Sequence, residues 1–157
     1  MRALRVALLA FATPMVSTLA ALAQRPKAVH VEVLVILAEH TDGGPLLDPK
    51  LGDLPIRQEP FVRYNSYQLL DRKELALEVG KSTADPLPNG RTLQLTLAEV
   101  TPNGPKWRFH IRAAIDDPSK AAAFLKQLDV TAGQNEPFFV AGQSYRGGTL
   151  FLEVAVR

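Results

Sequence analysis

Short stretches in which apolar and polar residues alternate recur along this chain, and they constrain its fold more than any other feature. The clearest is the last, residues 149–156, in which every second side chain is aliphatic: Leu150, Leu152, Val154 and Val156. Successive side chains of a β-strand point to opposite faces of a sheet. The pattern therefore predicts a strand with one face in the core and a mixed second face.

Similar stretches predict the other strands: residues 29–38, 61–71, 74–79, 92–100, 107–114 and 138–140. Arg72-Lys73 is interpreted as a polar break between two of them. Residues 118–131 have two interpretations. Asp117-Pro118 and the alanines after it can start a helix, whereas apolar residues at alternate positions favour a strand over 123–131. We adopt the strand and keep the helix as the alternative.

Glycine, proline and asparagine separate these stretches. Residues 87–90 and 101–105 are typical of hairpin turns, and residues 141–148 are interpreted as a loop. The irregular segment 39–60 is expected to cross from one sheet to the other. Within it, Asp48-Pro49 is suited to cap a short helical turn.

Residues 34–38 are apolar on both faces, so we expect that end of the first strand to be covered by another part of the chain. About eight short strands with turns of this kind indicate an all-β fold. We predict an antiparallel β-sandwich, with a small β-barrel as the alternative.

The first 23 residues differ from the rest. Arg2 and Arg5 precede an apolar stretch that ends in Ala21-Leu22-Ala23. A positive start, an apolar centre and small residues at the end are typical of a cleaved secretory signal peptide. The stretch is slightly short for a membrane span and contains Pro14, which favours cleavage over a retained anchor helix. We therefore expect residues 1–23 to be a signal peptide and the protein to be exported, periplasmic or extracellular.

Residues 24–157 suffice for a single domain with its own core. Residues 1–23 hold two of the 18 basic side chains and none of the 16 acidic ones, so the remainder has no formal net charge. We therefore expect no nucleic-acid partner. The absence of cysteine excludes disulfides and thiol chemistry. Charges on the non-core strand faces argue against integral membrane insertion after cleavage: Arg108, Arg112, Lys126 and Glu153.

Metal and nucleophile sites are not expected. His30 and His110 would have to lie on neighbouring strands to share an ion, and the acids beside His40 lack the spacing of a calcium loop. Ser144 lies among glycines, but Arg146 stands where a nucleophile elbow needs glycine. We predict no metal, no cofactor and no catalytic residue.

Aromatic and arginine side chains are the candidates for binding, because rings stack on ligands and guanidinium groups stack on rings. The candidate binding residues are Tyr64, Tyr67, Arg108, Tyr145 and Arg146. Phe61 and Trp107 could join them, although core positions are the more usual role of such residues.

Three segments, residues 60–71, 87–95 and 136–154, together resemble a group of small exported bacterial β proteins that carry a signal peptide and have no assigned function. The shared motifs are turns and strand patterns. The resemblance therefore implies export and a β fold, and it transfers no site.

From these observations we expect a binding or structural module of the cell envelope that is not an enzyme, with an envelope protein or a glycan as partner. Its oligomeric state is left open. The alternative is a small periplasmic hydrolase that uses acids of the irregular segment: Glu39, Asp42, Asp48 and Asp53.

Overall fold

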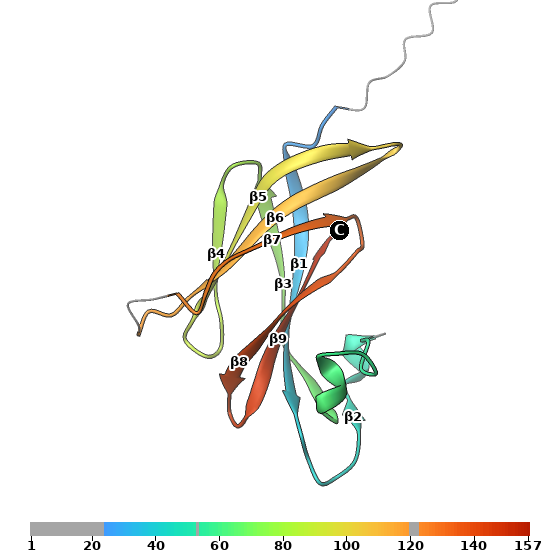
Figure 1. Ribbon diagram of the computed structural model, residues 1–157, viewed down its shortest axis with the longest axis vertical. Helices are drawn as coiled ribbons and strands as arrows, with labels where there is room; N and C mark the ends of the chain where they lie inside the picture. The colour runs from blue at the N-terminus through green and yellow to red at the C-terminus, as the bar shows by residue number, and fades with distance from the viewer. Residues whose placement is uncertain (1–23, 53, 120–122) are drawn as a thin grey trace, which may run out of the picture.

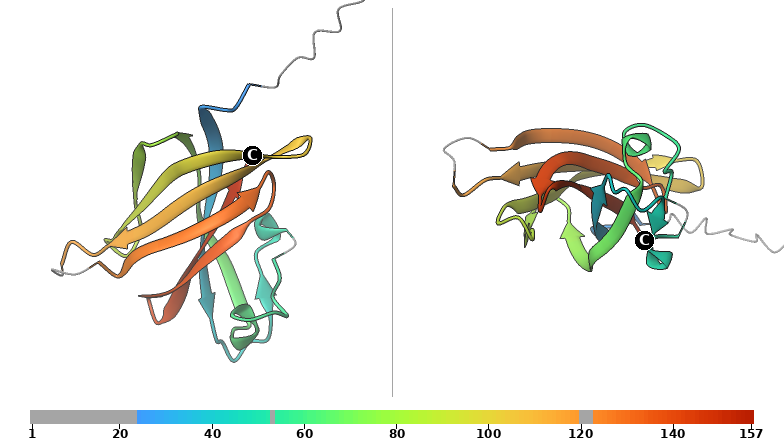
Figure 2. Two further views of the ribbon diagram at one scale, coloured as in Figure 1. Left: turned by 45° about the horizontal axis from the view of Figure 1, so that its top comes forward. Right: turned by 90° about the horizontal axis from the view of Figure 1, so that it is seen from below.

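The computed structural model describes residues 24–52, 54–119 and 123–157, which form an all-β sandwich (Figure 1). The predicted signal peptide lies outside the described residues. Sheet A has the order β2-β3-β1-β9-β8, and sheet B has the order β4-β5-β6-β7. The strands of sheet B cross those of sheet A obliquely (Figure 2).

The bounds in sheet A are β1 Ala28–Glu39, β2 Leu46–Leu47, β3 Ser66–Glu78, β8 Phe138–Tyr145 and β9 Gly148–Val156. Those in sheet B are β4 Ser82–Pro86, β5 Thr92–Asn103, β6 Lys106–Asp116 and β7 Leu125–Gly133. Two short 3₁₀ helices, η1 Pro49–Leu51 and η2 Phe61–Arg63, lie between β2 and β3. Both predicted hairpins and the predicted strand at residues 123–131 are confirmed, the latter from Leu125 onward.

The polar break expected at Arg72-Lys73 is wrong, because β3 continues through it and pairs with β1 along its length. Both charged side chains find partners without leaving the strand. Arg72 donates to Glu32 at 3.3 Å and to the Lys50 carbonyl at 3.0 Å, and Lys73 donates to Asp85 at 3.0 Å. Charged residues can thus occupy a long strand wherever neighbours supply counter-charges.

The segment between β1 and β3 does not cross between sheets, contrary to expectation. Glu39 pairs with Ser66, so β3 returns directly beside β1 in sheet A. The predicted helical cap is confirmed: the Asp48 carboxylate accepts a hydrogen bond from the Lys50 amide at 3.0 Å, and η1 begins at Pro49.

The loop expected over residues 141–148 is also wrong. Strand β8 continues to Tyr145, and only Arg146 and Gly147 turn the chain into β9. Both have positive φ, 48° and 87°, as the tightest hairpin turns require. A bulge between Val140 and Gln143, with Gly142 at φ 97°, absorbs the extra residues of β8.

The main core lies between the two sheets and is largely aliphatic. It contains the predicted inward face of β9, and its largest fully buried side chains are Leu77, Leu93, Leu95, Leu97, Ile111, Ile115, Leu150 and Leu152. At one end of the sandwich, isolated bridges join Val79 to Leu97 and Gln134 to Val156. These bridges link sheet A to sheet B at that end and make it barrel-like.

A second apolar group, the outer cluster, lies on the opposite face of sheet A. The irregular segment 46–64 covers that face, and the buried members are Leu34, Ile36, Ala38, Leu51, Leu54, Phe61, Tyr67 and Phe151. The prediction that another part of the chain covers the end of β1 is therefore confirmed.

Candidate functional site

Beside the outer cluster, the same face of sheet A carries a hollow of about 650 Å³, which we call the sheet-A hollow. Leu34, Leu51 and Phe139 form part of its lining and belong to the outer cluster or pack against it. Its polar side chains come from three strands and three connecting or terminal segments: Glu32, Lys50, Arg72, Asn135, Glu153 and Arg157.

Strand register brings two glutamates together in this hollow. Glu32 pairs with Ala155 and Leu34 pairs with Glu153, so the two carboxylates are diagonal neighbours on one face of adjacent strands. Arg72 pairs with Leu34 from the other side and faces the same way. The pairing of β1 with its two neighbours thus assembles the polar group.

Glu32 is fully engaged. Its Oε2 accepts from Arg72 at 3.3 Å, and its Oε1 accepts from Nε of Arg157 at 3.1 Å. Only 13% of its side chain is exposed. Two guanidinium groups around one shielded carboxylate fix the position of Glu32.

Glu153 differs from Glu32 although both line the same hollow. No hydrogen bond or ion pair joins its carboxylate to any other described residue, and it is half-buried. Burial raises the pKa of Glu153, the Glu32 charge raises it further, and Arg157 opposes both. Glu153 is therefore an acceptor that faces the hollow and is open to a partner.

A second hollow, of about 400 Å³, lies at the start of β6 and the end of β7, and we call it the tryptophan hollow. It is lined by the half-buried Trp107 together with Asn103, Arg108, Gln134, Asn135 and Glu136. Glu136 accepts from the Gly133 amide at 2.9 Å and pairs with Arg108, and these two contacts lower the pKa of Glu136.

The five predicted binding residues do not converge on one surface. Tyr67 is only 4% exposed and its hydroxyl donates to the Phe61 carbonyl at 2.6 Å, while Tyr64 donates to the Thr149 hydroxyl at 3.0 Å. Both belong to the outer cluster or its edge, whereas Tyr145 packs against the main core on the opposite face of sheet A.

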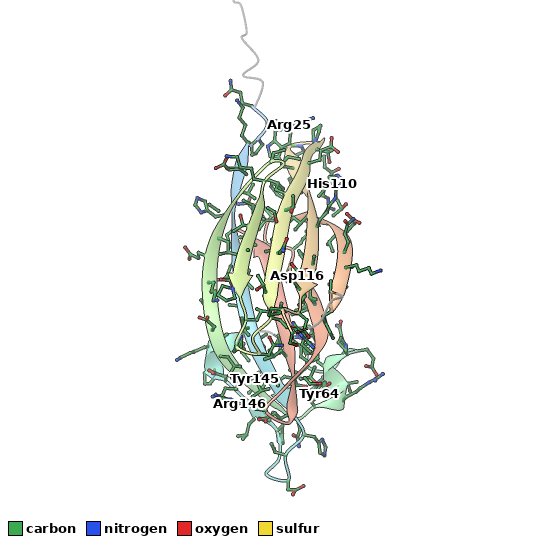
Figure 3. All side chains as sticks on the ribbon, turned by 90° about the vertical axis from the view of Figure 1, so that its left-hand side faces the viewer. Arg25, Tyr64, His110, Asp116, Tyr145 and Arg146 are labelled. Carbon is green, nitrogen blue, oxygen red and sulfur yellow. The ribbon has the colours of Figure 1, made fainter. Side chains whose placement is uncertain are left out.

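Arg146 lies in the β8–β9 turn with its guanidinium 5.0 Å from the Tyr145 ring centroid. Figure 3 shows Tyr145, Arg146 and Tyr64 toward one end of the molecule, far from His110. Arg108 lies in the tryptophan hollow of sheet B. The structure therefore brings together Tyr145 with Arg146 and Tyr64 with Tyr67, and places Arg108 apart from both pairs.

The histidines do not share a site, since His30 lies on β1 of sheet A and His110 on β6 of sheet B. The ring nitrogens of His110 lie 3.2 Å and 3.0 Å from the hydroxyls of Thr101 and Thr131. Within the described ranges, no group of three histidine or acidic side chains is placed to hold a metal ion.

Among the acids of the irregular segment, Asp48 caps η1 and also accepts from the Leu69 amide at 3.3 Å. The Lys50 amide, the main cause, and the Leu69 amide lower the pKa of Asp48. Asp53 lies outside the described residues. Of the acids of this segment that the structure describes, Glu39, Asp42 and Asp48, none lines the sheet-A hollow.

Sequence reasoning did not identify the sheet-A hollow. Its only signal was the mixed outer face of residues 151–157, in which Glu153 and Arg157 interrupt an otherwise apolar strand. Their partner Glu32 is more than a hundred residues away, and only the register of β1 against β9 places it beside them.

No protein-family model matches the chain, and comparisons with curated proteins and with solved structures gave no significant match. The resemblance drawn from residues 60–71, 87–95 and 136–154 therefore stays a prediction. None of the described segments forms a helix long and apolar enough to cross a membrane.

Proposed function

We propose that this protein is a non-catalytic binding module of the cell envelope, exported by its N-terminal segment, which holds its ligand in the sheet-A hollow. The observation that carries the proposal is the contrast between the two glutamates of that hollow. Glu32 is held by Arg72 and Arg157, whereas Glu153 is half-buried with no partner among the described residues.

An unpaired, partly buried carboxylate costs folding free energy because it loses hydration without gaining a hydrogen bond. Partly buried carboxylates with a shifted pKa are concentrated at functional sites. The hollow also has a rigid base, because β1 and β9 are both inner strands of sheet A and are packed on both faces. A rigid base with one open acceptor suits recognition of a ligand without rearrangement.

Affinity capture from an envelope extract tests the proposal. The bait is residues 24–157, beside Glu153→Gln and the matched control Glu99→Gln, whose glutamate is exposed on sheet B. We expect the native protein and the control to retain a ligand that Glu153→Gln releases. Equal retention by all three folded proteins would assign binding elsewhere and overturn the proposal.

The same glutamate pair supports a second candidate, a hydrolase. Two neighbouring carboxylates in unlike environments, one paired with two arginines and the other with a raised pKa, resemble the arrangement used for acid–base cleavage of glycosidic bonds. This candidate replaces the loop acids of the sequence-based alternative with Glu32 and Glu153. Turnover of envelope polysaccharide or peptide that is lost in both Glu32→Gln and Glu153→Gln would favour it over the binding module.

A further inference from the structure

Resting on the proposed binding function, we propose that the ligand is a glycan chain that occupies the sheet-A hollow and the tryptophan hollow together, passing over Asn135. The two hollows have volumes of about 650 Å³ and 400 Å³, each within the range of small-molecule sites. Asn135 lines both, so they are adjacent and only the turn after β7 separates them.

The turn that separates them is held rigidly. Asn135 has a φ of 60°, a conformation that asparagine tolerates better than most residues. Its amide donates to the Val156 carbonyl at 2.8 Å, and its side-chain oxygen accepts from Arg157 at 3.4 Å. The ridge between the hollows is thereby tied to β9 and to the arginine that holds Glu32.

The charges of both hollows are mostly paired within the protein. Arg108 pairs with Glu136 in one hollow, while Arg72 and Arg157 share Glu32 in the other. A basic peptide would meet the further positive charges of Lys50 and Lys106, and an acidic ligand would meet Glu153. An uncharged ligand avoids both conflicts.

The groups left to bind such a ligand are an open carboxylate acceptor and several side-chain amides, which both donate and accept: Glu153, Asn103, Gln134 and Asn135. Hydroxyl groups also donate and accept hydrogen bonds, so they can pair with the carboxylate as well as with the amides. One half-buried aromatic ring lines each hollow, Trp107 and Phe139, and the apolar face of a sugar ring can stack on it. Hydroxyls around an apolar ring face are the defining chemistry of a glycan.

The test uses an immobilised panel of uncharged oligosaccharides, each present as a disaccharide and as a hexasaccharide, with residues 24–157 as analyte. We expect at least one hexasaccharide to bind more tightly than its disaccharide, because only the longer chain reaches both hollows. Glu153→Gln and Trp107→Leu should each weaken hexasaccharide binding about tenfold or more, as expected for loss of a hydrogen bond to a charged group or of a stacking ring.

Asn135→Gly keeps the positive φ and removes only the side chain on the ridge, so it too should weaken hexasaccharide binding. Glu99→Gln is the control and should bind the hexasaccharide as the native protein does. Thermal unfolding checks that every variant is folded. No binding to the panel by the folded native protein, or hexasaccharide binding that survives both Glu153→Gln and Trp107→Leu, overturns the glycan inference. If envelope capture still shows a protein ligand lost with Glu153→Gln, the proposed binding function stands and only the glycan inference fails.

Discussion

The two apolar clusters on either side of sheet A are built differently. The main core is mostly aliphatic and takes alternate residues from the strands of both sheets. The outer cluster is rich in aromatic rings and joins β1, β3, β8 and β9 to an irregular segment with little strand pairing. In it, the Phe61 ring lies 4.7 Å from that of Phe151 and 4.9 Å from that of Phe139, measured between centroids.

The difference shows two ways of holding a chain against a sheet. Strands are already fixed by backbone ladders, so leucine and valine at alternate positions suffice to join two sheets. The segment 46–64 lacks a continuous ladder, and specific ring contacts and the hydroxyl of Tyr67 hold it instead. Because Leu51 and Phe139 also line the sheet-A hollow, this second arrangement shapes the candidate site.

Breaking the main core should have the largest effect. Leu152 is fully buried between the sheets, so Leu152→Ala removes buried methyl groups and leaves a cavity. We expect a loss of about 2–5 kcal/mol in the free energy of unfolding, measured by urea denaturation. Leu46→Ala, at a residue 59% exposed, is the control and should change stability by less than about 0.5 kcal/mol. A loss for Leu152→Ala as small as that of the control would contradict the assignment of this residue to the core.

An intermediate effect is expected from Tyr67→Phe in the outer cluster. The change removes the hydroxyl that donates to the buried Phe61 carbonyl, which should cost about 1–3 kcal/mol. Limited proteolysis should then cut the segment 46–64 faster, while the sandwich strands stay protected. Tyr64→Phe is the comparison, because that hydroxyl bonds only to the half-buried Thr149 and its loss should matter less. Uniform proteolysis across the whole chain would show that the two clusters are not separable.

The smallest effect concerns pH. The pKa of Glu153 is raised above the ordinary value of 4.5, and burial is the main cause of this shift. The folded protein therefore binds this proton more tightly than the unfolded chain, and the associated stability is present below 4.5 and lost as pH rises through the raised pKa. Glu153→Gln has no such group, so its stability relative to the native protein should rise over that pH range. Parallel stability–pH curves would contradict the placement of Glu153.

What the sequence predicted correctly depends on local patterns. The alternation in residues 149–156 identified the inward face of β9, and Asp48-Pro49 identified the start of η1. Residues 34–38 are apolar on both faces, and this pattern predicted that another part of the chain covers that end of β1. Each of these follows from neighbouring residues, whose side-chain directions are set by strand or helix geometry.

What it predicted wrongly depends on partners distant in the chain. Arg72 and Lys73 looked like a break because the acids that pair with them, Glu32 and Asp85, are not adjacent in sequence. For Tyr67, which stays a candidate binding residue, no local signal places the carbonyl of Phe61 beside its hydroxyl. The glutamate pair of the candidate site likewise exists only through the register of β1 against β9.

The strand order has a consequence for how the molecule forms. Sheet B joins β4, β5, β6 and β7 in chain order, so each pairing closes a short loop. Sheet A places β1 beside β9, and closing so long a loop is entropically slow. Sheet B can therefore assemble while the chain is still being synthesised, whereas one edge of β1 must wait for β9. Until then that edge presents unpaired backbone N–H and C=O groups, at which a nascent chain can associate with another strand.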